Sequence, residues 1–263
     1  LLVCAGYWLL LIAGAADLDL GDVDVDADAD VHGGGPSWGM AALKFANLGD
    51  VPLMIWNGVF DELVPVAGVL DHVEALDQLE YRYVFDLFTL TDHFALAVND
   101  EYGPAADFLG ERKVVRNPAH VTYVRNPSMD FPRLGTRADH AYWLSGIRVR
   151  DEAANDGRGA VDAFSHGFGK ADRAAEETQN SAGTLEGGQF YPSAPYTRQS
   201  RGWGEAPAAK ARQRLELTLT NLDRVRVHMR RARLDCDADV EVESDGPARV
   251  VLVGCDRSVR APP

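Results

Sequence analysis

Two short apolar runs joined by an amphipathic segment, within residues 51–87, restrict the fold of this chain more than any other feature. The first run, residues 51–58 (VPLMIWNG), is continuous and ends in Asn-Gly, as in strands buried on both faces of a parallel sheet. Residues 66–79 then carry apolar side chains at near-helical spacing, which predicts a helix with one apolar stripe. Residues 81–87 (YRYVFDL) are rich in aromatic and β-branched types and predict a second strand.

An acidic residue follows the first predicted strand, and a histidine follows the second. Asp61 and His93 are 32 residues apart, but neighbouring parallel strands place their C-terminal loops side by side, so the two side chains can meet. A carboxylate that accepts the imidazole Nδ1–H fixes the tautomer and leaves the other ring nitrogen free to act as a base. Two other interpretations stay open: Asp61 caps the helix that follows it, and His93 is an ordinary loop histidine.

The pattern G-x-x-D-E-L-V-P at residues 58–65, followed by Asp92-His93, resembles the closing part of α/β-hydrolases of the prolyl-oligopeptidase and esterase kind. The resemblance begins at about residue 51. It implies a serine hydrolase that cleaves an ester or peptide bond, with Asp61 as triad acid and His93 as general base. A small-molecule ester, a peptide or a polymer would be the substrate, with no cofactor and no metal.

The nucleophile is harder to find in the sequence. One G-x-S-x-G match exists, Gly35-Pro36-Ser37-Trp38-Gly39, but the motif should follow a buried strand. An aspartate-rich segment precedes it instead, which favours a flexible linker. Residues 51–93 also supply only two strands and one helix, so we expect a truncated hydrolase that is weakly active or inactive.

Residues 1–16 (LLVCAGYWLLLIAGAA) are uncharged and almost wholly apolar. A membrane span, the remnant of a signal peptide and a buried core helix all fit such a run. The first two predict a membrane-associated or secreted protein of the cell envelope, with membrane contact through residues 1–16.

Residues 17–50 are rich in Asp and then in Gly, with seven aspartates in residues 17–30. Carboxylates at alternate positions could converge on calcium, but no register supplies the Gly and Glu of an EF-hand loop, so a solvated linker is the better interpretation. Residues 1–58 as a whole resemble the N-terminal part of bacterial inner-membrane proteins that carry an OB-fold domain, through Tyr7-Trp8, the D-x-D-x run and the segment 45–56 (FANLGDVPLMIW).

After the hydrolase-like segment, 51–110, residues 111–263 read as a β-rich domain. Alternating apolar and polar residues predict half-buried antiparallel strands, and an all-β sandwich is the natural architecture. The strands fall near residues 120–124, 141–149, 214–220, 224–228, 238–242 and 249–253.

Within this domain, Ser244-Asp245-Gly246-Pro247 predicts a hairpin turn between the last two strands. Cys236 and Cys255 flank it and are either disulfide-bonded or free buried thiols. Residues 150–212 read as a long stretch of low order.

The fold class is therefore α+β: a partial α/β-hydrolase unit (strand–helix–strand) followed by an antiparallel β-sandwich. Six aromatic residues could line a carbohydrate surface or simply pack in the core: Trp143, Phe164, Phe168, Tyr191, Tyr196 and Trp203. The net charge of −14 disfavours a nucleic-acid partner. The alternative function is a non-enzymatic β-sandwich binding module, membrane-anchored or secreted.

Overall fold

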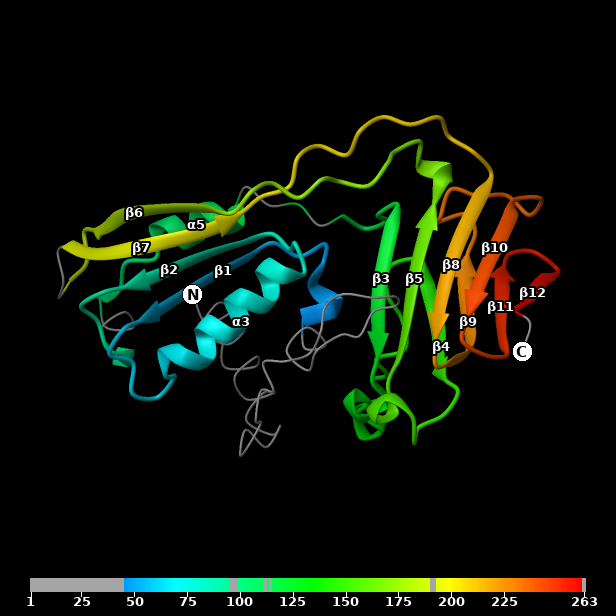
Figure 1. Ribbon diagram of the computed structural model, residues 1–263, viewed down its shortest axis with the longest axis horizontal. Coiled ribbons are helices and arrows are strands. Elements are labelled where there is room, and N and C mark those ends of the chain that lie inside the picture. Colours follow the sequence, from blue (N-terminus) through cyan, green and yellow to red (C-terminus); the bar gives the residue numbers. More distant parts are fainter. Residues whose placement is uncertain (1–44, 95–98, 111–112, 114, 190–192, 262–263) are drawn as a thin grey trace. The chain divides into compact units, whose positions relative to one another are not determined.

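In the described part of the computed structural model, most of the regular secondary structure belongs to three sheets of four strands each (Figure 1). The structure describes residues 45–94, 99–110, 113, 115–189 and 193–261. Residues 1–16, the aspartate-rich run and Ser37 lie outside the described residues, so the predictions made for them stay predictions. The described part is a mixed α+β structure with few helices and mostly antiparallel pairing.

The first sheet contains the predicted strand–helix–strand segment. Its strand order is β1-β2-β7-β6, and the strands are β1 (Leu53–Gly58), β2 (Tyr83–Phe88), β6 (Gln179–Glu186) and β7 (Ser193–Arg201). The pair β1–β2 is parallel, and β2–β7 and β6–β7 are antiparallel. Both strands of the parallel pair were predicted from their apolar runs.

Helix α3 (Val66–Gln78) links β1 to β2 and lies against this sheet (Figure 1). Its buried Val69, Val73 and Leu76 pack with Tyr83 and Phe85 of β2, so the stripe read from the sequence is the buried side of the helix. Pro65 precedes the helix and no side chain caps it, which removes helix capping as the role of Asp61.

The prediction of low order for residues 150–212 is wrong, because this stretch contains strands β5, β6 and β7. β6 is almost wholly exposed and therefore lacks the apolar alternation that reveals a strand in a sequence. β7 joins β2 through polar contacts instead. Arg198 of β7 donates from Nε and Nη2 to the buried Asp86 of β2, at 2.6 and 2.7 Å.

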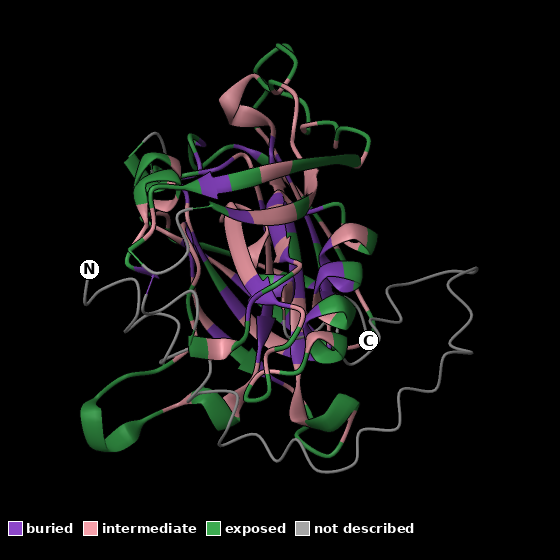
Figure 2. Ribbon diagram, turned by 90° about the vertical axis from the view of Figure 1, so that its left-hand side faces the viewer, coloured by how far each residue is buried: buried purple, intermediate pink, exposed green. Residues whose placement is uncertain are grey.

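Two further sheets enclose the largest apolar core. One has the order β10-β8-β5-β3 and the other β12-β11-β9-β4. The strands of the first are β3 (His120–Arg125), β5 (Gly159–Ser165), β8 (Arg214–Thr220) and β10 (Asp239–Ser244). Those of the second, called sheet D below, are β4 (Leu144–Val149), β9 (Leu222–His228), β11 (Ala248–Val253) and β12 (Arg257–Ala261). A single cluster of buried side chains takes members from both sheets, including Leu217 from β8 and Val250 from β11, and the buried residues gather inside (Figure 2).

The predicted hairpin at residues 244–247 is wrong. β10 and β11 belong to different sheets, where each pairs in parallel, with β8 and β9 respectively. The segment is a corner rather than a hairpin: the backbone N–H of Asn221, at the equivalent corner between β8 and β9, donates to both carboxylate oxygens of Asp245 at 3.0 Å. The chain crosses from one sheet to the other at each of these two corners, and the bonds between Asn221 and Asp245 hold the corners together.

Cys236 and Cys255 form a disulfide, which settles the choice that the sequence left open. The bridge ties the segment before β10 to the segment after β11, so it closes a loop that contains strands of both sheets.

The other helices that lie wholly within the described residues are short. They are α5 (Gly103–Gly110) and five single turns of 3₁₀ helix at Ala46–Leu48, Pro127–Met129, Pro132–Leu134, Asn155–Gly157 and His166–Phe168. Among the described residues, no helix has both the length and the apolar character to span a membrane.

Candidate active site

Asp61 and His93 meet where the loops after β1 and β2 come together. Nδ1 of His93 lies 3.0 Å from each carboxylate oxygen of Asp61. The two loops adjoin because β1 and β2 are parallel neighbours in register from Leu53–Tyr83 to Gly58–Phe88. The two residues singled out in the sequence are thus brought into contact.

The Asp61 carboxylate is held firmly in place. Its Oδ1 accepts backbone N–H groups of Leu63 and Val64, at 3.0 and 2.7 Å. Its Oδ2 accepts Nδ2 of Asn57 at 3.3 Å. The Asp61 side chain is 7% exposed and that of His93 is 33% exposed, so the histidine ring is anchored at one nitrogen while part of it stays open to solvent.

Asn57 also belongs to the site, although its place in the sequence indicated only the end of the first predicted strand. It is buried, and its Nδ2 also donates to the Val64 carbonyl at 3.3 Å. Its Oδ1 is buried without a hydrogen-bond partner among the described residues. Asn57 therefore braces the turn that carries Asp61. The sequence feature that could have indicated this role is its position directly before Gly58 in an apolar run.

Gly58 allows the two loops to approach closely. A Cβ added here would lie 2.4 Å from the backbone oxygen of Thr91. The Phe60 N–H donates to that same oxygen at 3.0 Å, and Thr91 is itself buried. The contact fixes the path of the chain two residues before His93.

We expect Gly58→Ala to lower the free energy of unfolding by about 2 kcal/mol, because the backbone of the second loop must shift. Urea denaturation measures the change. Gly68→Ala is the matched control, because a Cβ at that helical position meets nothing within 4 Å and alanine favours helix. Equal stability of Gly58→Ala and wild type would contradict the close approach.

Four exposed apolar side chains lie close to Asp61 and His93 in the sequence. Phe60 and Leu63 flank Asp61 in the chain, and Leu90 and Phe94 flank His93, each between 58% and 66% exposed. Phe94 also packs edge-on to the His93 ring, with the ring centroids 5.5 Å apart. These four side chains are called the apolar rim below, and exposed apolar side chains of this size are suited to contact an apolar ligand.

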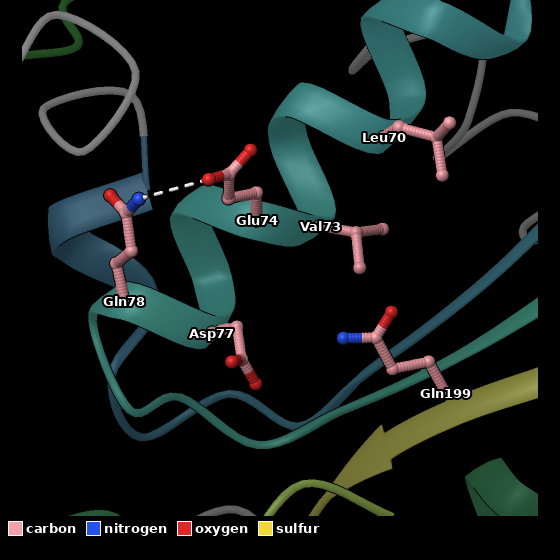
Figure 3. Close-up of a pocket in the computed structure, with 6 residues that line it drawn as sticks. All are labelled: Leu70, Val73, Glu74, Asp77, Gln78 and Gln199. Carbon is pink, nitrogen blue, oxygen red and sulfur yellow. Dashed lines mark hydrogen bonds between the residues drawn. The ribbon is translucent and has the colours of Figure 1, made fainter. Parts of the chain in front are cut away.

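A separate pocket of about 350 Å³ lies between α3 and β7 (Figure 3). Asp77 on its wall accepts hydrogen bonds from Thr178 (2.5 Å), Tyr83 (2.8 Å) and Arg201 (3.1 Å). Burial would raise the pKa of the Asp77 carboxyl, but the bonds from Thr178 and Tyr83 and the charge of Arg201 outweigh burial and lower that pKa. A carboxylate so fully paired serves to join α3 to β7.

A serine and a histidine also meet on sheet D. Ser145 Oγ lies 2.8 Å from Nε2 of His228, and burial, with the charges of Arg231 and Arg226, lowers the pKa of His228. Among the described residues no carboxylate pairs with this ring. The contact therefore lacks the acid that orients a catalytic base.

His120 forms an ion-pair cluster that no local sequence pattern indicates. Its Nδ1 lies 2.9 Å from Asp172, and its Nε2 lies 2.9 Å from Asp162. Burial would lower the pKa of His120, but the hydrogen bonds and charges of the two carboxylates raise it to about 10. The ring is therefore an imidazolium at neutral pH.

The His120 cluster predicts a stability that depends on pH. A raised pKa stabilises the fold fully below about pH 6.5, and this contribution is lost as the pH rises through about 10. We expect His120→Gln to remove on the order of 1 kcal/mol of this pH-dependent stability, since the two carboxylates are half exposed and screened. Melting temperatures of wild type and His120→Gln between pH 6 and 10 test it, and parallel curves would contradict the ion pairs.

The aromatic residues singled out in the sequence do not share one surface. Trp143 is fully buried in the core that sheet D shares with the sheet β10-β8-β5-β3, and Trp203 lies under the guanidinium of Arg82. Phe164 packs between the rings of His120 and His166. Tyr196 contacts Phe88, Phe168 lies beneath Arg233, and Tyr191 is outside the described residues.

Among the described residues, no group of three or more His, Cys, Asp or Glu side chains is arranged to hold a metal ion.

Comparison of the chain with protein-family models, with curated proteins and with solved structures finds no match.

Proposed function

We propose that this chain is a serine-type hydrolase of ester or peptide bonds, with Asp61 as the acid and His93 as the general base. One observation carries the proposal: the His93 Nδ1 lies 3.0 Å from both oxygens of a buried carboxylate that other donors hold in place. A carboxylate in this position keeps the proton on Nδ1 and leaves Nε2 as a base.

The chemistry follows from that tautomer. Nε2 of His93 takes the hydroxyl proton of a serine as the serine oxygen attacks the substrate carbonyl carbon. The proton then passes to the leaving alcohol or amine as the scissile bond breaks. Water repeats the sequence on the acyl-enzyme, releasing the acid and restoring the serine. Ser37 is the candidate nucleophile, on the strength of its G-x-S-x-G motif.

The apolar rim favours esters with apolar acyl groups over charged substrates. Phe60, Leu63, Leu90 and Phe94 are exposed apolar side chains near Asp61 and His93 in the sequence, and burial of such surface contributes about 25 cal/mol per Å² to binding. We therefore propose an activity that rises with acyl chain length.

The fold supports an α/β-hydrolase unit at the level of its elements. A helix links two parallel strands, and the acid and the base follow those strands in that order. The sheets β10-β8-β5-β3 and β12-β11-β9-β4, which share one core, support the β-sandwich interpretation of residues 111–263. The disulfide favours an oxidising compartment, and we propose a secreted or membrane-associated location.

Hydrolysis of p-nitrophenyl esters of increasing chain length tests the proposal. We expect weak activity in the wild type and a loss of at least about 100-fold in kcat/KM for His93→Ala, because a general base contributes about 10² to 10⁴ in rate. His140→Ala, which removes a largely exposed histidine (69%) whose ion pair among the described residues is with the adjacent Asp139, is the matched control. An unchanged kcat/KM in His93→Ala overturns the assignment.

The second candidate is a binding module without enzymatic activity, built from the two sheets that share the largest apolar core. One observation favours it: the outer face of sheet D carries aligned arginines.

A further inference from the structure

Four arginines stand in register across sheet D. Arg260 of β12 is opposite Arg249 of β11, Arg249 is opposite Arg224 of β9, and Arg224 is opposite Arg148 of β4. Residues directly opposite each other in a sheet have their side chains on the same face. These four residues, here called the arginine row, therefore cross the whole sheet as one line.

The row lies on the outer face of sheet D. The strand neighbours Ile147, Val225 and Val250 are buried in the shared core, and successive side chains of a strand point to opposite faces. Arg148, Arg249 and Arg260 are accordingly exposed. Arg226, two residues after Arg224 in β9, is exposed on the same face and widens the basic surface.

Like charges opposite one another destabilise a sheet. Few carboxylates that the structure describes offset the positive charge of the arginine row. Asp223, which bonds the Arg148 guanidinium (Nε to Oδ1, 2.6 Å), is the one carboxylate in ion-pair contact with these four arginines among the described residues. Nε of Arg224 is buried without a hydrogen-bond partner in the described part of the chain. A depression of about 240 Å³ beside Arg249 and Arg260 leaves room at one end of the row.

We propose that the arginine row binds a linear acidic polysaccharide that lies across the strands of sheet D. Neighbouring strands are about 4.8 Å apart, so four guanidiniums span roughly 14 Å. Each guanidinium offers a planar pair of donors that matches a carboxylate or sulfate. A chain with one such anion on each sugar presents charges at regular intervals to this line of cations.

Two other polyanionic partners fit less well. A nucleic acid is the less suitable partner because the disulfide favours an oxidising compartment. An anionic membrane surface usually receives inserted aromatic or long aliphatic side chains. None of the large exposed apolar residues in the described part of the chain lies on sheet D.

Binding of polygalacturonate to the full chain, followed by calorimetry at several salt concentrations, tests the proposal. We expect saturable binding that weakens as salt rises, and at least a tenfold increase in Kd for the double variant Arg224→Gln/Arg249→Gln. The control Arg133→Gln/Arg137→Gln removes the same charge from exposed positions elsewhere and should bind as the wild type does. Asp223→Asn, which frees Arg148, should tighten binding.

Several outcomes overturn the proposal: no binding of polygalacturonate at low salt, equal weakening in both double variants, or tighter binding of duplex DNA or of phosphatidylglycerol vesicles. Loss of the facing like charges should leave the melting temperature of Arg224→Gln/Arg249→Gln at or above that of the wild type, so weaker binding cannot be ascribed to unfolding. The proposal is independent of the hydrolase proposal, and His93→Ala should bind polygalacturonate as the wild type does.

Discussion

Asp86→Ala should lower the free energy of unfolding by about 3 kcal/mol, because it leaves a guanidinium without its buried partner. Asp86 is fully buried and accepts two hydrogen bonds from Arg198 and one from the indole of Trp56, at 2.9 Å. These bonds join β7 to the parallel pair β1–β2. The Arg198 side chain is 30% exposed, so water can solvate it in part, which limits the expected loss.

Urea denaturation measures this loss, and a second variant separates ion-pair breakage from lost packing. Asp86→Leu combined with Arg198→Met removes both charges and should be more stable than Asp86→Ala alone, as expected when no buried charge is left unpaired. Wild-type stability of Asp86→Ala would show that the hairpin β6–β7 does not depend on this contact.

Replacing both bridged cysteines, Cys236→Ser/Cys255→Ser, should lower the free energy of unfolding by about 3 kcal/mol, as expected for a loop of this length. The bridge joins residues 19 apart in the chain. The loop contains β10 and β11, which pair with different sheets, so the unfolded chain gains freedom in strands of both sheets when the bridge is absent.

Reducing agent provides the control for the disulfide. The wild type should lose the same stability under reducing conditions, while the double variant should be indifferent to them. A wild type whose urea midpoint is unchanged on full reduction would contradict a stabilising bridge.

The sequence was informative where structure depends on local periodicity. The strand–helix–strand segment follows from two apolar runs and one stripe, and the meeting of Asp61 and His93 follows from the geometry of parallel strands. Both features require only short stretches of chain and one general rule about where parallel strands end.

Features that depend on pairing across long distances were missed. β6 and β7 are polar strands whose position is set by Asp86, more than 100 residues from Arg198. β10 and β11 alternate like a hairpin, yet they pair in parallel with β8 and β9, because the corner at Asp245 is held by Asn221. The arginine row exists only in the register of four strands, which no local pattern specifies.

Labelling of the purified chain with a fluorophosphonate probe, followed by peptide mass mapping, tests the central claim most directly. If Asp61 and His93 activate a serine, one serine is modified, and the modification is lost in His93→Ala and strongly reduced in Asp61→Asn. The peptide mass map identifies that serine, and Ser37, in the one G-x-S-x-G match, is the first to examine. No modification of a folded wild-type chain, or modification that persists in His93→Ala, as labelling of Ser145 by way of His228 would, contradicts the claim.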